Sequence, residues 1–186
     1  LRIDFLGSGR SEGDWADTTF AGQARDARRA LEHLARLLPG ELPDALLGYS
    51  QGGLVALRAG GADRLALWNP VLDPKDVYGR LLGPEALAEG VRRDAAGDER
   101  IVGDTRLRPA FFADLAGADP LADAARFPGP LLVVAGTRDS IARNGPEGAR
   151  VAAGRRDAPT EILVVEAGHD LGAVSDLARF DAVLAC

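Results

Sequence analysis

The order of apolar and polar positions predicts short strands that alternate with helices. Brief apolar runs bounded by turn residues predict strands over residues 1–6, 45–49, 64–69, 130–136 and 161–166. Apolar residues that recur every three or four positions predict helices over residues 18–38, 51–59, 146–153 and 171–184. A repeated strand–helix–strand order favours a mostly parallel sheet with helices on both faces. The predicted fold class is therefore α/β.

The pattern is less regular in the stretch between residues 71 and 127. Prolines interrupt this stretch, and the remainder predicts short helices, such as residues 85–94 and 109–116. No internal repeat and no low-complexity tract separates it from the rest of the chain. We therefore interpret residues 1–186 as one domain.

Composition narrows the class of protein further. The chain has 186 residues, of which 46% are hydrophobic and 27% charged, as is typical of a folded soluble domain. Its formal net charge is −6 and no run of Lys or Arg exceeds two residues, so no nucleic-acid partner is expected. No apolar run approaches the ~20 residues that span a bilayer, so no membrane partner is expected either. The only cysteine, Cys186, excludes an internal disulfide.

These features predict a cytoplasmic protein. Lys75 is the only lysine among 22 basic residues, which is typical of a GC-rich bacterial genome. The oligomeric state stays open at this point.

Residues 48–52 read G-Y-S-Q-G and match the pattern G-x-S-x-G between a predicted strand and a predicted helix. This motif needs a very tight turn that leaves the hydroxyl of the serine, Ser50, exposed. The positions two residues before and after the serine must then be small, as Gly48 and Gly52 are. Gly53 leaves further room for the helix to pack. Ser50 is therefore the candidate nucleophile.

A serine hydroxyl needs a base and an oxyanion donor to act as a nucleophile. Gln51 is the first residue of the predicted helix, so its backbone N–H points to where an oxyanion would form. The chain has two histidines. His33 lies within the long helix and is interpreted as an ordinary, partly exposed side chain. His169 lies in the loop after the last predicted strand, where parallel sheets place catalytic groups, and is the candidate base.

An acid that orients this histidine is expected at the carboxyl end of another strand. Asp139 follows the most apolar strand and is the first choice, although a turn residue or a partner of Arg138 is the alternative interpretation. Asp73, after the third predicted strand, is a competitor for the same role. The order Ser50, Asp139, His169 is the serine–acid–histidine order of one hydrolase fold and differs from that of the two well-known serine protease folds.

Together these motifs resemble the α/β-hydrolase superfamily, in particular its serine esterases, thioesterases and serine aminopeptidase-like members. Residues 2–13 resemble the strand and loop before the nucleophile unit, and residues 67–73 resemble the strand and turn after it. Residues 131–139 and 167–170 resemble the loops of the acid and the histidine. The resemblance implies the α/β-hydrolase fold and cleavage of a small-molecule ester, thioester or amide by acyl transfer. It implies no metal and no organic cofactor.

The resemblance also implies a cap over the active site. In such enzymes the stretch that corresponds to residues 73–127 has this position. Its aromatic residues Tyr78, Phe111 and Phe112 would then bind substrate together with Tyr49. The alternative is that these rings simply anchor a surface insertion.

One part of the superfamily pattern has no counterpart in the sequence. Members carry further strands and a His-Gly-type loop, the second oxyanion donor, before the segment that begins at Leu1. We expect this N-terminal part to be missing, which would leave a gap beside the strand of Ser50. Loss of one oxyanion donor would cost roughly 10²–10³ in rate. A catalytically impaired scaffold that acts as a binding module is therefore the alternative function.

A dinucleotide-binding protein is the third hypothesis, because Gly7, Gly9 and Gly13 follow the first predicted strand. A dinucleotide loop leads directly into a helix, whose positive end meets the pyrophosphate. Here Glu12 and Asp14 give the loop negative charge instead, which disfavours an anionic cofactor.

Overall fold

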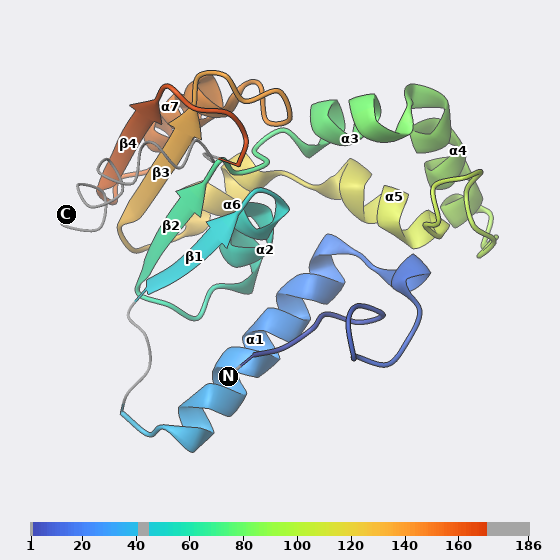
Figure 1. Ribbon diagram of the computed structural model, residues 1–186, viewed down its shortest axis with the longest axis horizontal. Coiled ribbons are helices and arrows are strands. Elements are labelled where there is room, and N and C mark those ends of the chain that lie inside the picture. The colour runs from blue at the N-terminus through green and yellow to red at the C-terminus, as the bar shows by residue number, and fades with distance from the viewer. Residues whose placement is uncertain (1, 41–44, 171–186) are drawn as a thin grey trace.

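The computed structural model describes residues 2–40 and 45–170 of the chain (Figure 1). The helix predicted over residues 171–184 lies outside the described residues, as does Cys186. Within the described residues the strands form one parallel sheet of four, in the order β1-β2-β3-β4. The strands are β1 (Ala45–Tyr49), β2 (Arg64–Trp68), β3 (Leu131–Gly136) and β4 (Thr160–Val165).

The parallel register brings the carboxyl ends of the strands to one edge of the sheet. Tyr49, the last residue of β1, pairs with Trp68, the last residue of β2. Trp68 in turn pairs with Val134 of β3, and Gly136 at the end of β3 pairs with Val165 at the end of β4. The four loops that follow these strands are therefore neighbours, although they are far apart in the sequence.

Four of the described helices lie on the side of the chain that holds the sheet. They are α1 (Phe20–Leu37), α2 (Gln51–Ala59), α6 (Pro120–Arg126) and α7 (Gly145–Gly154). Helix α2 packs on β1 and β2, and α7 packs on β3 and β4. Helix α1 packs on α2, and α6 packs between α2 and α7. Apolar side chains between these helices and the sheet form the main core, including Leu67 and Val133, which are 1% and 0% exposed. The strands and helices confirm the predicted α/β class.

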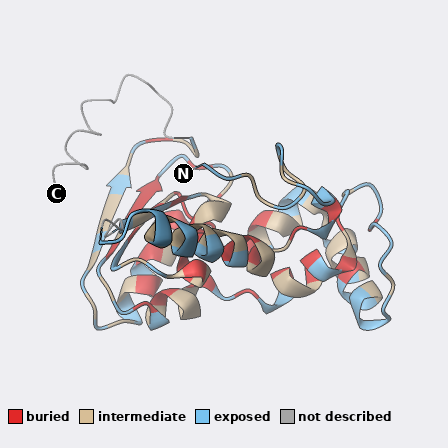
Figure 2. Cartoon of the chain, turned by 90° about the horizontal axis from the view of Figure 1, so that it is seen from below, coloured by how far each residue is buried: buried red, intermediate tan, exposed pale blue. Residues whose placement is uncertain are grey.

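A second group of helices extends away from the sheet (Figure 1). It consists of α3 (Pro74–Leu82), α4 (Pro84–Ala95) and α5 (Pro109–Gly117). Each begins with a proline, which fits the first turn of a helix because that turn needs no N–H partner. Their buried side chains form a second apolar cluster, which Phe20 of α1 and Leu54 of α2 join. Figure 2 shows buried residues on these helices as well as beside the sheet. In that cluster Phe112 lies directly against Gly90, where a Cβ would be only 2.1 Å from the ring.

The strand predicted over residues 1–6 is wrong for the residues that the structure describes. Residues 2–5 have no regular structure, and a series of turns follows them. This segment runs beside α1, where the N–H of Leu6 donates to the carboxylate of Asp26 (3.4 Å) (Figure 1). A strand needs the hydrogen bonds of a neighbouring strand, and none of the four described strands pairs with this segment. Within the described residues, β1 lies at one end of the sheet.

Candidate active site

Ser50 occupies a strained turn between β1 and α2. Its backbone has φ 54° and ψ −123°, a left-handed φ that a residue with a side chain rarely adopts. The turn is fixed by its neighbours: the N–H of Ser50 donates to the carbonyl of Trp68 (2.9 Å), and its own carbonyl accepts from the N–H of Val71 (3.1 Å). The predicted strand–turn–helix unit is therefore present, at the carboxyl edge of the sheet.

The glycines around Ser50 have different roles. A Cβ on Gly48 would lie 2.4 Å from the carbonyl oxygen of Gly52 and 2.6 Å from the Cα of Gly53, so only glycine fits there. A Cβ on Gly53 would lie 2.8 Å from the ring of Pro70. The steric requirement predicted at Gly52 is wrong: within the described structure a Cβ there meets no atom within 4 Å, since this position faces open space.

His169 reaches the serine from the loop that follows β4. Its Nε2 lies 2.8 Å from the Oγ of Ser50. The imidazole packs beside the ring of Tyr49, with 5.3 Å between ring centroids. Burial and the nearby carboxylates of Asp170 and Asp139 raise the pKa of Tyr49. His33, the other histidine, is an exposed residue of α1, close to the interpretation made from the sequence.

Asp139 lies on the opposite side of the imidazole, and its side chain is only 1% exposed. One carboxylate oxygen, Oδ2, lies 2.8 Å from the Nδ1 of His169. The other, Oδ1, accepts from the backbone N–H groups of Ile141 (2.7 Å) and Ala142 (2.8 Å). Because a carboxylate only accepts hydrogen bonds, this contact assigns the imidazole proton to Nδ1 and leaves Nε2 free to accept from the serine. Asp139 therefore acts both as a turn residue, through Oδ1, and as the partner of the histidine, through Oδ2.

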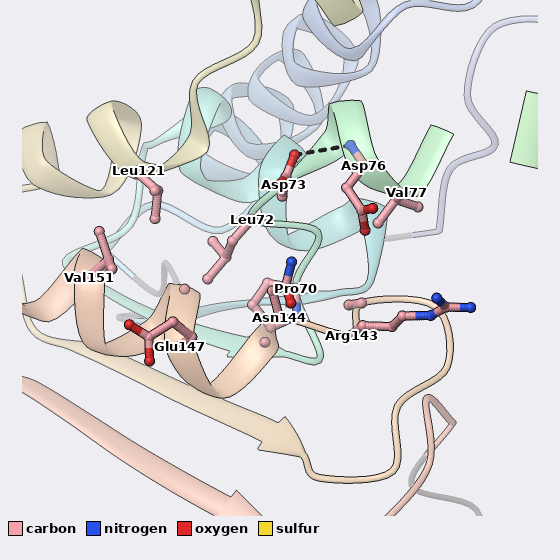
Figure 3. A pocket seen from close by; sticks show the side chains of 13 residues that line it. Pro70, Leu72, Asp73, Asp76, Val77, Leu121, Arg143, Asn144, Glu147 and Val151 are labelled. Carbon is pink, nitrogen blue, oxygen red and sulfur yellow. Dashed lines mark hydrogen bonds between the residues drawn. The ribbon is translucent and has the colours of Figure 1, made fainter. Parts of the chain in front are cut away.

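Asp73, the competing acid, has a different environment. Its Oδ1 accepts from the N–H of Asp76 (3.0 Å) and so caps the start of α3. It lines a pocket of about 200 Å³ between α3 and α7, with Arg143 and Glu147 on the opposite wall (Figure 3). The structure brings Asp139, and not Asp73, to His169.

A chain of polar side chains surrounds Gln51 at the start of α2. Its backbone N–H is one of those that have no partner within the helix. Its side-chain carbonyl accepts from the hydroxyl of Tyr78, and its amide donates to Gln23 of α1 (2.7 Å). Gln23 donates in turn to the hydroxyl of Thr18 (3.0 Å), and both of these residues are buried. The network connects α1, α2 and α3 beside Ser50.

We expect Tyr78 to make the stability of the protein sensitive to alkaline pH. Burial raises the pKa of Tyr78 to about 12, from an ordinary value of 10. Above pH 10 the unfolded chain therefore loses this proton first, and up to about 3 kcal/mol of unfolding free energy is lost as the pH rises through 12. Denaturant unfolding between pH 9 and 12 should show this component in the wild type but not in Tyr78→Phe. The variant Tyr49→Phe keeps Tyr78 and should retain this component, whereas equal pH slopes in the wild type and Tyr78→Phe would contradict the prediction.

The aromatic residues expected to bind substrate lie in two places. Tyr49 is 43% exposed beside His169. Tyr78 contacts the rings of Phe20 and Phe111, with centroids 5.5 and 5.3 Å away. Phe111 and Phe112 are 3% and 1% exposed within the core of α3–α5. The packing of the insertion accounts for these two phenylalanines, whereas Tyr49 packs beside His169 and Tyr78 bonds to Gln51, the residue after Ser50.

Sequence reasoning missed Asn69, which is buried directly behind the site. Its amide contacts the loops of both Asp139 and His169. The sequence Asn-Pro after a strand signals a turn, but it carries no sign that the side chain connects two distant loops. Gln23 was missed because a polar residue within a helix gives no sign that its side chain bonds to Gln51 of another helix.

The glycine-rich loop near the N-terminus forms a closed turn and not the start of a helix. Asp4 occupies its interior, where its carboxylate accepts from the N–H of Arg10 (3.1 Å) and its backbone carbonyl accepts from the hydroxyl of Ser11 (2.5 Å). A Cβ on Gly9 would lie 2.4 Å from this carboxylate. Helix α1 begins only at Phe20, so its positive end does not open onto the loop. These contacts disfavour a dinucleotide at this position.

Within the described ranges, no group of three or more His, Cys, Asp or Glu residues is arranged to hold a metal ion. None of the described helices combines the length and apolar character that crossing a membrane requires.

The fold and the site define an α/β protein with a serine on a tight strand–turn–helix unit at the carboxyl edge of a parallel sheet. The sequence profile of the alpha/beta hydrolase family matches residues 1–183. The chain therefore belongs to the alpha/beta hydrolase family, and its enzyme class is that of a hydrolase. No curated protein sequence matches the chain.

Solved structures share this fold at low sequence identity. Est1E from Butyrivibrio proteoclasticus, solved with ferulic acid bound, aligns with a TM-score of 0.70 and 21% identity, over 96% of this chain and 72% of Est1E. Alpha/beta hydrolase domain-containing protein 10 from mouse aligns with a TM-score of 0.66 and 19% identity, over 97% and 74% of the two chains. The monoacylglycerol lipase of Paleococcus ferrophilus aligns with a TM-score of 0.63 and 21% identity, over 97% of this chain and 79% of the lipase.

Proposed function

We propose that this protein is a serine hydrolase that cleaves a carboxylic ester, thioester or amide through an acyl-enzyme. The observation that carries the proposal is the pair of 2.8 Å contacts that joins Asp139 to His169 and His169 to Ser50. These three residues come from separate loops, and the two contacts use both ring nitrogens. A nucleophile, a base and an orienting acid need this order.

The proposed reaction has two halves. In the first, the Oγ of Ser50 attacks the substrate carbonyl while the Nε2 of His169 takes the hydroxyl proton. The tetrahedral oxyanion is stabilised by the backbone N–H of Gln51 at the positive end of α2. Its collapse breaks the bond to the leaving group, which receives the proton from His169. In the second half, water attacks the acyl-enzyme with His169 again as base, and Ser50 regains its proton.

Asp139 contributes by orientation and charge. Its carboxylate holds the Nδ1–H of His169 and stabilises the imidazolium that forms when Nε2 takes a proton. Because Oδ1 is occupied by two backbone N–H groups, the carboxylate cannot turn away from the imidazole. The geometry of the base is thus set before substrate binds.

Within this class we favour a small-molecule ester as substrate. Structural relatives of the chain include an esterase domain from Rhodothermus marinus and a monoacylglycerol lipase, which supports an ester over other acyl compounds. Tyr49 and Tyr78 are the aromatic residues that we assign to substrate binding. Helices α3–α5 would then act as the cap of a single domain, since α3 carries Tyr78 to Gln51 beside the nucleophile.

Covalent labelling tests the proposal. A fluorophosphonate should form a P–O bond with Ser50 and release fluoride. Mass spectrometry then detects the phosphonyl adduct on the peptide that contains Ser50. Ser50→Ala should lose the adduct, whereas Ser140→Ala should keep it, because Ser140 is an exposed serine whose hydroxyl lies outside the proposed mechanism. Hydrolysis of p-nitrophenyl acetate should follow the same pattern. A folded wild-type protein that neither labels nor hydrolyses would instead support the binding-module alternative.

A further inference from the structure

Asn69 is a buried polar residue that the proposed reaction does not use. It follows β2 directly and is only 1% exposed. Its backbone has φ +42°, a left-handed conformation that asparagine tolerates better than most residues. Its N–H donates to the carbonyl of Val134 in β3 (2.8 Å), so the residue is held against the neighbouring strand.

The side chain of Asn69 connects the ends of β3 and β4. Its Oδ1 accepts from the N–H of Gly136 (2.7 Å), three residues before Asp139. Its Nδ2 donates to two carbonyls of the next loop, those of Gly168 (3.0 Å) and His169. One amide therefore holds the loop of the acid and the backbone of the histidine itself.

The chemistry of this position is specific to an amide. One partner is an N–H and two are carbonyls, so the side chain must offer one acceptor and two donors over a short reach. Asparagine does this. An aspartate of the same shape would place a carboxylate against the two carbonyls, and a glycine would remove the partner of all three groups.

We propose that Asn69 is a positioning residue, which sets the imidazole of His169 between Ser50 and Asp139 by holding the backbone of the histidine loop. This inference rests on the proposed function, because only a catalytic His169 needs its imidazole held in this position. The reason is geometric: His169 Nε2 and Nδ1 each make a 2.8 Å contact on opposite sides of the ring, so a shift of the backbone by 1 Å would disturb this alignment. A misplacement of about this size costs roughly 10²-fold in rate.

The variant Asn69→Asp tests the inference, since it keeps the shape, the acceptor and a tolerance for the left-handed backbone. The second-order rate of fluorophosphonate labelling of folded protein should fall roughly 10²-fold. Long-range ¹H–¹⁵N NMR spectra report the tautomer of each imidazole independently of activity. His169 should be an Nδ1–H tautomer in the wild type and a mixture of tautomers in the variant, as expected of the exposed His33 in both.

Two further variants separate positioning from general stability. Asn69→Gly keeps the backbone conformation without the amide and should give the same two changes, so the test does not depend on the folding of Asn69→Asp. Asp114→Asn makes an equal-sized exchange in the ion pair with Arg58 (2.8 Å) between α5 and α2. It should lower the melting temperature and leave the labelling rate and the His169 tautomer unchanged.

The outcomes for the two proposals are distinct. Wild-type tautomer and labelling rate in both Asn69 variants would overturn the role of Asn69. Equal changes in Asp114→Asn would also overturn it, since they would trace the effect to stability. If wild-type protein fails to label but the His169 tautomer still changes only in the Asn69 variants, the proposed function fails and the positioning of the imidazole by Asn69 stands.

Discussion

Asp139→Asn is expected to lower turnover by about 10⁴-fold while the protein stays folded. The two carboxylate oxygens have different partners, since Oδ1 accepts from Ile141 and Ala142 and Oδ2 contacts Nδ1 of His169. An asparagine keeps its oxygen on the two N–H groups, which turns its NH₂ toward the imidazole. The imidazole proton must then move to Nε2, which leaves no acceptor for the hydroxyl of Ser50. Steady-state hydrolysis of p-nitrophenyl acetate, together with thermal unfolding, measures both parts of the prediction.

The matched control is the same exchange at the competing acid. Asp73 caps α3 and asparagine caps a helix equally well, so Asp73→Asn should leave turnover unchanged. The unfolding free energy should change by no more than about 0.5 kcal/mol. The opposite pattern, with turnover lost in Asp73→Asn and kept in Asp139→Asn, would transfer the role of the acid to Asp73.

Gly48→Ala is expected to have the second largest effect, on both stability and reactivity. Its methyl group would lie 2.4 Å from the carbonyl oxygen of Gly52 and 2.6 Å from the Cα of Gly53. These are backbone atoms of the first turn of α2, which cannot move aside as a flexible side chain would. We expect a loss of roughly 3 kcal/mol in unfolding free energy and loss of fluorophosphonate labelling at Ser50, because the turn that exposes the hydroxyl must open. Denaturant unfolding and intact-protein mass spectrometry test this.

Gly52→Ala is the control for the tight turn. A methyl group there meets no atom of the described structure within 4 Å, and alanine is the better helix former. The unfolding free energy should therefore rise by about 0.5–1 kcal/mol. A loss as large as that of Gly48→Ala would show that the turn needs small residues on both sides, as the motif alone suggests.

Much of the fold was predictable because local patterns encode it. The strand over 45–49 and the helix over 51–59 were predicted with the bounds that the structure has, since an apolar run and a glycine-flanked turn mark them. The bounds of α4 and α5 were predicted to within one or two residues, because prolines mark where these helices begin. The helices α3 and α6 were not singled out, and the seven residues of α6 carry little periodicity.

The wrong strand near the N-terminus shows the limit of this reasoning. Ile3 and Phe5 alternate with polar residues as in a strand, yet Ile3 is 42% exposed in a segment beside α1. Alternation describes how a segment can pair, whereas pairing itself needs a partner strand at the right place. Such a partner is a property of the whole sheet.

The candidate site was likewise predictable in part. Ser50, Asp139 and His169 were named from the sequence because each follows a strand, and the carboxyl ends of parallel strands share an edge. The sequence did not decide which of Asp139 and Asp73 contacts His169. In the structure the carboxylate of Asp73 caps α3, whereas that of Asp139 is held by its own loop and contacts the imidazole.

Local sequence patterns were sufficient to predict the α/β class, the tight turn and the residue types of the site. These features follow from interactions between residues that are close in the chain. The choice among acids, the burial of Phe112 and the three hydrogen bonds of Asn69 arose from packing between segments up to 100 positions apart. Such contacts form only when several elements fit together at once. For that reason the amide that holds the histidine loop was found in the folded protein and not in its sequence.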